Sequence, residues 1–299
     1  MRLVVGVTPE PQSLDALALG CALSESLQAE LVVTNIVPRG YDFPGAAHVD
    51  AEWRAFLVEQ ADATLARARE ELRDRPGVSY RMSFHNSSGV GLDQFAAQID
   101  AQLIVVGSAP GGSTDRIEIG STADQLLHGA STAVAIAPYG YANWAPSATR
   151  RAVVAYQATP EARHALDLLI DMLSSADRVS QQRLALIGVV SQQTRIYGSR
   201  LGSQAEDAVI AALVEVSDSA LLDAAAGVPA TFQPVTTQVV VGRDVPNAMS
   251  HFDWADDDLL VVGSTRRGPV RRVLLGDMSH RIIKATSVPI CVVPRSATL

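Results

Sequence analysis

The chain has 299 residues, of which 47% are hydrophobic, 5% aromatic and 19% charged, and its formal net charge is −8. This composition is that of a folded protein with an ample core and excludes the disordered classes. The acidic balance argues against nucleic-acid binding, and without an apolar run of about 18 residues we expect no membrane span.

The N-terminus enters a strand-like pattern directly and has no signal-peptide layout, so we expect a cytoplasmic protein. Two cysteines, Cys21 and Cys291, do not form a disulfide framework. Both lie in apolar surroundings, and we expect both to be buried free thiols.

The first part of the chain alternates between strand and helix signals. Apolar or alternating runs predict strands at residues 3–7, 30–37, 78–84, 102–108 and 133–137. Helical spacing predicts helices from Leu14 to Ala22, from Val49 to Arg73, around residues 92–99 and from Ser121 to Gly129. Apolar strands that alternate with helices indicate a doubly wound α/β domain, with a parallel sheet of five strands covered on both faces.

The second part of the chain repeats this order. Strands are predicted at residues 153–156, 184–190, 236–241, 259–262 and 290–293, and helices at 159–173, 203–226, 245–254 and 277–285. In the helix at 203–226, an apolar stripe is predicted to face the core because core burial is the usual fate of such stripes. The stripe comprises Ala208, Val209, Ala212, Leu213 and Val216.

The two parts are related by sequence. "RLVVGVTPEPQSLDAL" at residues 2–17 aligns without gaps on "RAVVAYQATPEARHAL" at 151–166, and "LIVVG" at 103–107 matches "LLVVG" at 259–263. We therefore predict a tandem duplication, with domains at residues 1–138 and 151–299. The linker at 139–150 is turn-rich and carries aromatic residues, so we expect it to pack against the domains.

Each half also closes on a short apolar strand, "TAVAIAP" at 132–138 and "VPICVVP" at 288–294. Apolar edge strands are an aggregation hazard unless they are covered. Pairing of the two closing strands would bury both edges.

The fourth strand of each half leads into a glycine-bearing loop and then a helix. Ligands of open parallel sheets bind beyond the carboxyl ends of the strands, and a helix N-terminus suits phosphate. The spacing of these loops, with the duplication, resembles a tandem universal stress protein over almost the whole chain. The resemblance implies two adenine nucleotide alpha hydrolase-like domains. It also implies that the two closing strands pair and make the chain an internal pseudo-dimer; the alternative is two halves connected only by the linker. Nucleotide-binding members share a G-x2-G-x9-G-[S/T] loop at the ATP phosphates and ribose, and an aspartate after the first strand near the adenine and ribose.

In the first half, this resemblance is incomplete. The candidate nucleotide-binding residues are Thr8, Gly107, Pro110, Gly111, Gly112, Gly120, Ser121 and Thr122. Gly107, Gly120 and Ser121 fit the motif. Pro110 replaces its second glycine and removes an N–H donor, although the two glycines that follow restore some freedom. Thr8 stands in place of the aspartate and supplies no carboxylate.

The second half departs further. Its candidate residues are Gly263, Arg266 and Gly276, and the position of the aspartate holds Gln157. Asp277 follows Gly276 and is a strong N-cap, which would occupy the helix N–H groups that a phosphate needs. Arg266 and its basic neighbours at 267, 271 and 272 could grip a phosphate. Alternatively, they pair with acidic residues or are solvated.

No nucleophile, general base or metal-ligand spacing is evident, so we expect neither an enzyme nor a metalloprotein. The resemblance implies a stress-responsive regulatory or interaction protein, here with degenerate nucleotide loops, an unidentified protein partner and an additional homodimeric contact as an option. The alternative is a protein that binds ATP or AMP in the first domain, with at most slow hydrolysis. A third, weaker hypothesis is an enzyme that uses the arginine cluster on a small phosphorylated substrate.

Overall fold

The computed structural model of the chain describes residues 1–39, 47–73, 75–109, 116–174, 182–192, 203–264 and 277–294. The elements of the first half are β1 (Arg2–Gly6), α1 (Ser13–Leu27), β2 (Glu30–Val37), α2 (Ala47–Glu71), β3 (Val78–Phe84), α3 (Ser88–Gln98), β4 (Leu103–Gly107), α4 (Ser121–Gly129) and β5 (Ala133–Ala137). After the short 3-10 turn η1 (Tyr141–Asn143), the second half comprises β6 (Arg151–Ala155), α5 (Pro160–Ser174), β7 (Arg183–Ser191), α6 (Ser203–Ala226), β8 (Thr236–Gly242), α7 (Val245–Met249), β9 (Asp258–Gly263), α8 (Asp277–Ala285) and β10 (Ile290–Val293). The doubly wound α/β fold predicted for both halves is confirmed.

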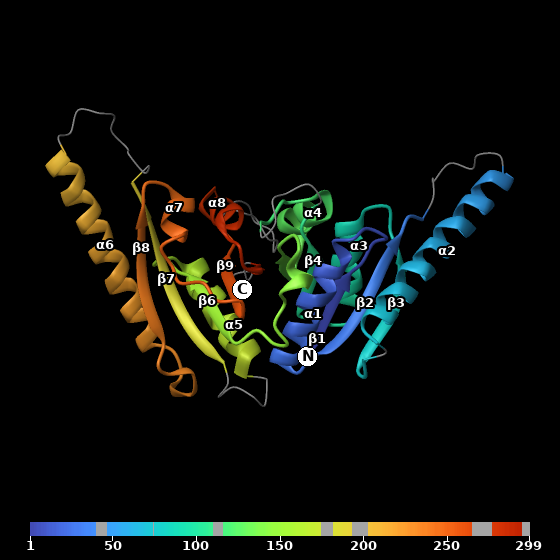
Figure 1. The fold of residues 1–299 in the computed structure, drawn as a ribbon, viewed down its shortest axis with the longest axis horizontal. Helices are drawn as coiled ribbons and strands as arrows, with labels where there is room; N and C mark the ends of the chain where they lie inside the picture. Colours follow the sequence, from blue (N-terminus) through green and yellow to red (C-terminus); the bar gives the residue numbers. More distant parts are fainter. Residues whose placement is uncertain are drawn as a thin grey trace.

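The strands of the described chain form one sheet of ten, in the order β3-β2-β1-β4-β5-β10-β9-β6-β7-β8 (Figure 1). Within each half, neighbouring strands are parallel. At the middle of the sheet, β5 and β10 pair antiparallel, with Ile136 opposite Ile290 and Ala135 opposite Cys291. The pseudo-dimer expected from the two closing strands is therefore confirmed, and each half protects the apolar edge of the other.

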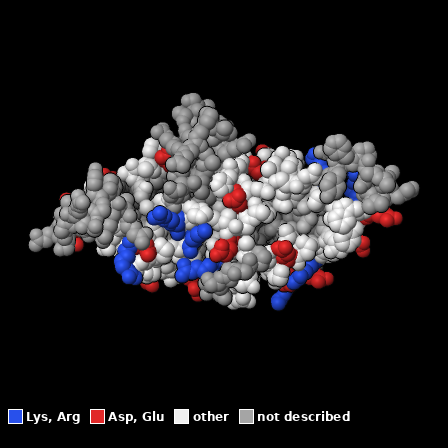
Figure 2. All heavy atoms as spheres, turned by 90° about the horizontal axis from the view of Figure 1, so that it is seen from above, with Lys and Arg blue, Asp and Glu red and all other residues white. Residues whose placement is uncertain are grey.

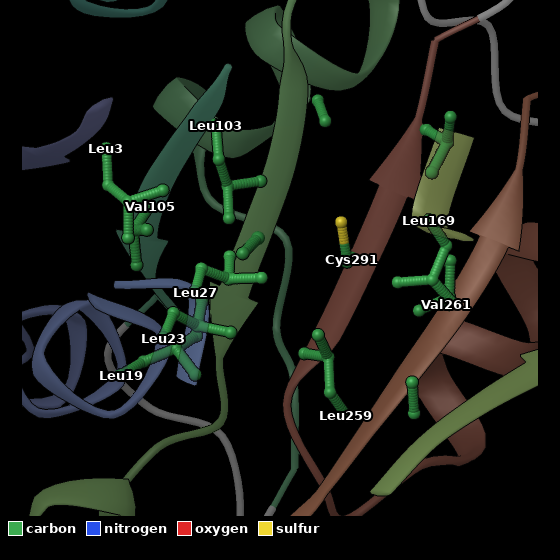
Figure 3. Close-up of a cluster of buried hydrophobic side chains, with 14 of the residues drawn as sticks. Leu3, Leu19, Leu23, Leu27, Leu103, Val105, Leu169, Leu259, Val261 and Cys291 are labelled. Atoms are coloured by element: carbon green, nitrogen blue, oxygen red, sulfur yellow. The ribbon is translucent and has the colours of Figure 1, made fainter. Parts of the chain in front are cut away.

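The core is continuous across this junction. One face of the sheet is covered by α1, α2, α5 and α6, and its buried cluster includes residues from both halves, such as Leu23 and Leu103 from the first and Leu259 and Val261 from the second (Figure 3). The buried cluster on the other face likewise joins Ile136 to Ile290. Because each fully buried leucine or isoleucine contributes about 1.5–3 kcal/mol, the halves stabilise one another.

The connecting segment packs onto α1. The buried carboxylate of Asp15 accepts hydrogen bonds from the backbone N–H groups of Gly140, at 2.9 Å, and Ala142, at 2.8 Å. Next to these bonds, the ring of Tyr141 is fully buried and meets Trp144 edge to face, with ring centroids 4.5 Å apart. This packing agrees with the expectation from the aromatic residues of the segment.

The orientation predicted for α6 is wrong. The stripe assigned to the core is exposed: Val209, Leu213 and Val216 have 57%, 44% and 67% of their surface accessible. Leu221 and Ala224, on a different face near the end of the helix, are the residues that are buried against the sheet. The side of α6 that packs against β7 carries Ser217 and Leu221, which both lie next to Gly188, whereas the predicted stripe lies on another side of the helix.

Two smaller expectations also need correction. Cys291 is a buried free thiol as predicted, but Cys21 is only partly buried. The helix predicted at residues 245–254 ends at Met249, and the indole N–H of Trp254 donates to the Met249 carbonyl instead. Among the described helices, none is both long enough and apolar enough to cross a membrane.

Candidate functional site

A pocket of about 300 Å³ lies at the carboxyl ends of β1, β2 and β4, between the starts of α1 and α4. We call it the first-half pocket. Among its lining residues are five that the sequence singled out: Thr8, Gly107, Gly120, Ser121 and Thr122. The candidate residues of the first half that the structure describes therefore lie together at one site.

At the end of β1, the chain is held by Ser13. The hydroxyl of Ser13 accepts a hydrogen bond from the backbone N–H of Thr8 and lies 2.8 Å from the Thr8 carbonyl oxygen, to which it donates. The Thr8 hydroxyl lies 3.3 Å from the same oxygen of Ser13. Thr8 thus borders the pocket with its hydroxyl and, as the sequence indicated, without a carboxylate.

The glycine after each fourth strand has a structural reason independent of any ligand. A Cβ atom on Gly107 would collide with the carbonyl oxygen of Gln12, just before α1. In the second half, a Cβ on Gly263 would lie 2.8 Å from the carbonyl oxygen of Glu161. Only glycine permits this close approach of helix and strand. The first glycine of the motif is therefore evidence for the fold rather than for nucleotide binding.

The start of α4 is the part of the site suited to an anion. Gly120 is the N-cap, in extended conformation, and no described side chain caps the helix there. The N–H groups of the first turn, around Ser121 and Thr122, border the pocket and have no intrahelical carbonyl partner. The buried hydroxyl of Ser108 accepts a hydrogen bond from the Glu118 N–H at 2.8 Å and so fixes the segment that leads into α4.

The charge of this pocket is negative. Among the described residues that line it there is no lysine, arginine or histidine, and Glu10 is the charged member, with its carboxylate accepting a hydrogen bond from the Gln12 side chain. Residues 110–115, "PGGSTD", contain no basic residue either. Seen from this edge of the sheet, basic side chains gather over the second half, and acidic side chains lie near the middle and over the first half (Figure 2).

Thr34 is a member of the pocket that the sequence analysis missed. It lies in β2 opposite Gly6 of β1, is fully buried, and its hydroxyl has no hydrogen-bond partner in the described structure. Burial of a hydroxyl without a partner destabilises the fold, so a ligand that formed a hydrogen bond with Thr34 would remove this cost. The signal was available, because Thr34 interrupts the apolar run "LVV" of a strand expected to be buried on both faces.

A second pocket occupies the equivalent position in the second half but holds only about 120 Å³. The strand register shows why. Ala155 pairs with Ile187 where Gly6 pairs with Thr34, and Met278 follows the first residue of α8 as Thr122 follows the first residue of α4. Each of these replacements adds apolar volume, so the second-half pocket is smaller and less polar.

Comparison with known proteins places the chain in a family. The model of the universal stress protein family matches residues 1–138 and again residues 148–294. The chain belongs to the universal stress protein family. Universal stress proteins of Mycobacterium tuberculosis and Mycobacterium bovis are 31% identical to it over 300 residues, covering 98% of this chain and 100% of theirs.

Solved universal stress proteins share the fold over the full length. A structure from Archaeoglobus fulgidus aligns with a TM-score of 0.62 at 17% identity, covering 97% of each chain. A putative universal stress protein from Pseudomonas aeruginosa aligns with a TM-score of 0.56 at 14% identity, covering 98% of this chain and 94% of its own. The tandem arrangement deduced from the internal repeat is thus found in relatives of the same length.

Several of the predicted family positions lie outside the described residues: Pro110, Gly111, Gly112, Arg266 and Gly276. Gly263 and Gln157 both border the second-half pocket. Gln157 takes the position there that Thr8 takes in the first-half pocket. Asp277 begins α8, as Ser121 begins α4. In the described part of this universal stress protein, no group of three or more potential ligand side chains could hold a metal ion.

Proposed function

We propose that this universal stress protein is a stress-responsive regulatory protein that binds one adenine nucleotide, in the first-half pocket, and none in the second half. The observation that carries the proposal is the uncapped start of α4 at Gly120 and Ser121, which borders a pocket large enough for a nucleoside. An uncapped helix start combines unpaired N–H donors with the positive end of the helix dipole, and both favour a phosphate.

The charge of the pocket favours AMP over ATP. A triphosphate brings about four negative charges at neutral pH, and neither the lining nor the loop at 110–115 offers a cation to balance them. Glu10 would repel each added phosphate. The start of α4 carries roughly half an elementary positive charge, which offsets part of the charge of one phosphate but little of the charge of three. ATP is therefore expected to bind more weakly than AMP unless a divalent cation accompanies it.

The second half is expected to bind no nucleotide for two reasons. Ile187 and Met278 reduce the pocket to about 120 Å³, well below the usual size of a ligand site. Asp277 adds a carboxylate at the beginning of α8, where a phosphate would sit in the first half. Neither half presents an evident nucleophile or general base, so we propose sensing of the nucleotide rather than turnover.

Calorimetric titration of the full chain with AMP, ATP and ATP plus Mg²⁺ tests this proposal. We expect one site per chain and tighter binding of AMP than of metal-free ATP. Ser121→Asp copies the second half into the first and should weaken AMP at least about tenfold, or about 1.4 kcal/mol. Thr159→Asp is the matched control, since it adds the same charge at the start of α5, where Thr159 already accepts from the Ala162 N–H, and it should leave AMP binding unchanged.

Two results would count against the proposal. Two equivalent sites per chain would show that the second half binds as well. No binding of either nucleotide at millimolar concentration would leave a regulatory protein that acts through protein contacts alone, with both nucleotide loops degenerate.

A further inference from the structure

A larger cavity, of about 530 Å³, lies on the opposite edge of the sheet from the first-half pocket. We call it the junction pocket. Its walls come from the last turns of α1, with Cys21 and Glu25, from Arg75 before β3, and from the connecting segment, with Pro146 and Arg150. Gln182, just before β7, closes it from the second half. Both halves and the segment between them therefore contribute to one cavity.

The charged groups of the junction pocket are unequally matched. Arg75 donates to the Glu25 carboxylate at 3.1 Å, and these two side chains are 34% and 39% exposed. The guanidinium of Arg150 has no hydrogen-bond or ion-pair partner within the described chain, although it lines the same cavity. Among the described residues that line the cavity, two arginines and one glutamate leave an excess positive charge, which contrasts with the acidic first-half pocket and with a net charge of −8 for the whole chain.

Arginine is the side chain best matched to oxyanions, because its planar fork of N–H donors binds carboxylate or phosphate oxygens in pairs. Arg75 uses only part of its five donors on Glu25, and the described residues provide no partner for the donors of Arg150. The volume exceeds what a bare ion fills and lies within the range of small-molecule sites. Pro146 and neighbouring alanines supply the apolar wall that an organic body needs.

We propose that the junction pocket is a second binding site, for a small organic oxyanion such as a phosphate monoester or a carboxylate, held by Arg150 and Arg75. Its occupant touches α1 and the connecting segment at once. The site is independent of the nucleotide proposal, because it uses different residues at the other edge of the sheet.

Cys21 provides a reporter within the cavity. It lines the junction pocket beside Arg75. Burial raises the pKa of the Cys21 thiol, and the charge and hydrogen bond of Arg75 oppose this effect. The only other cysteine of the chain, Cys291, is buried in β10, and burial raises its pKa to about 12. Alkylation by neutral iodoacetamide near pH 8.5 should therefore modify Cys21 selectively, and an occupant should slow it.

The experiment measures the alkylation rate of Cys21 in the full chain by mass spectrometry, with inorganic phosphate, glycerol 3-phosphate or citrate added at constant ionic strength. We expect saturable protection by at least one of these anions and none by glycerol. Comparison of the protection by the phosphates with that by citrate shows which oxyanion the pocket prefers. Arg150→Gln, which does not alter the contact between Arg75 and Cys21, should reduce the protection at least tenfold.

Arg163→Gln is the matched control, because it removes an exposed arginine that pairs with Asp167 elsewhere on the surface, and protection should persist. Protection should also persist in Ser121→Asp, which separates this site from the nucleotide site. The proposal is overturned if no anion protects at 20 mM, because any binding would then be weaker than roughly 2–3 kcal/mol. It is equally overturned if protection survives in Arg150→Gln or if chloride protects as well as the oxyanions.

Discussion

Thr34 and Ile187 occupy the same register position in the two halves of the sheet, the first opposite Gly6 and the second opposite Ala155. Both are fully buried, but one brings an unpartnered hydroxyl to the floor of its pocket and the other an apolar side chain. This pair of residues contributes to the difference between a pocket of about 300 Å³ and one of about 120 Å³, along with Ala155 and Met278 of the second half. The two copies of the duplicated domain have thus diverged at the base of the site as well as in its loops.

Thr34→Val should separate stability from binding. Valine keeps the shape and removes the unpartnered hydroxyl, so we expect the free energy of unfolding without ligand to rise by about 1 kcal/mol. If the hydroxyl bonds to the bound nucleotide, AMP affinity should fall by about two- to tenfold, the value of one neutral hydrogen bond. Urea unfolding and calorimetry on the same variant measure the two effects. If Thr34→Val is less stable than the natural chain, the Thr34 hydroxyl has a hydrogen-bond partner in the folded protein.

The fold could be predicted from the sequence because its signals are repeated and mutually consistent. The closing strands "AVAIA" and "ICVV" are too apolar to lie at an open edge, and this apolarity, together with the resemblance to paired universal stress protein domains, predicted their pairing. The face of α6 could not be predicted in this way. Alanine, valine and leucine occur on several sides of that helix, so Val209 and Leu221 look equivalent, and only the packing of the helix against the sheet decides which is buried.

The candidate site was predictable in part. Fixed spacing identified Gly107, Gly120 and Ser121, which the fold brings together at one pocket. The floor of that pocket depends on which strand residues face which helices, and this is set by register and not by local spacing. The junction pocket depends on Arg75 and Arg150, which are far apart in sequence and line one cavity because the connecting segment packs onto α1.

Asp15→Asn should weaken the attachment of the connecting segment. Each carboxylate oxygen of Asp15 accepts one backbone N–H, from Gly140 and Ala142, and the residue is only 5% exposed. Asparagine replaces one acceptor by an NH2 donor that faces an N–H, which should lower the free energy of unfolding by about 1–3 kcal/mol. Asp93→Asn is the control, since it alters a similar but exposed bond to the Ser131 N–H and should cost less than 1 kcal/mol. Equal losses in the two variants would contradict this role of Asp15.

The Cys291 thiol should make the chain less stable at alkaline pH. Burial in β10 raises its pKa to about 12, above the value of about 8.5 for an unfolded chain. Between these two values the unfolded state loses the proton and the folded state keeps it, so stability is complete below pH 8.5 and falls above it by up to about 1.4 kcal/mol per pH unit. Urea unfolding of the natural chain and of Cys291→Ala, at pH 8 and pH 10.5, isolates this contribution. A stability difference between the two proteins that does not change with pH would show that the thiol is not held in its neutral form.

The two halves should remain associated after the chain between them is cut. Antiparallel pairing of β5 with β10 and buried clusters that draw on both halves connect them without the backbone of the linker. With a protease recognition sequence inserted between Pro146 and Ser147, the cleaved fragments should elute together in size-exclusion chromatography. Ala135→Pro removes a backbone donor from the middle of the sheet, opposite Cys291, and in this background the cleaved fragments should separate or precipitate. If the fragments of the otherwise unaltered chain separate and each stays folded, the halves are independent domains and the shared core contributes little to holding them together.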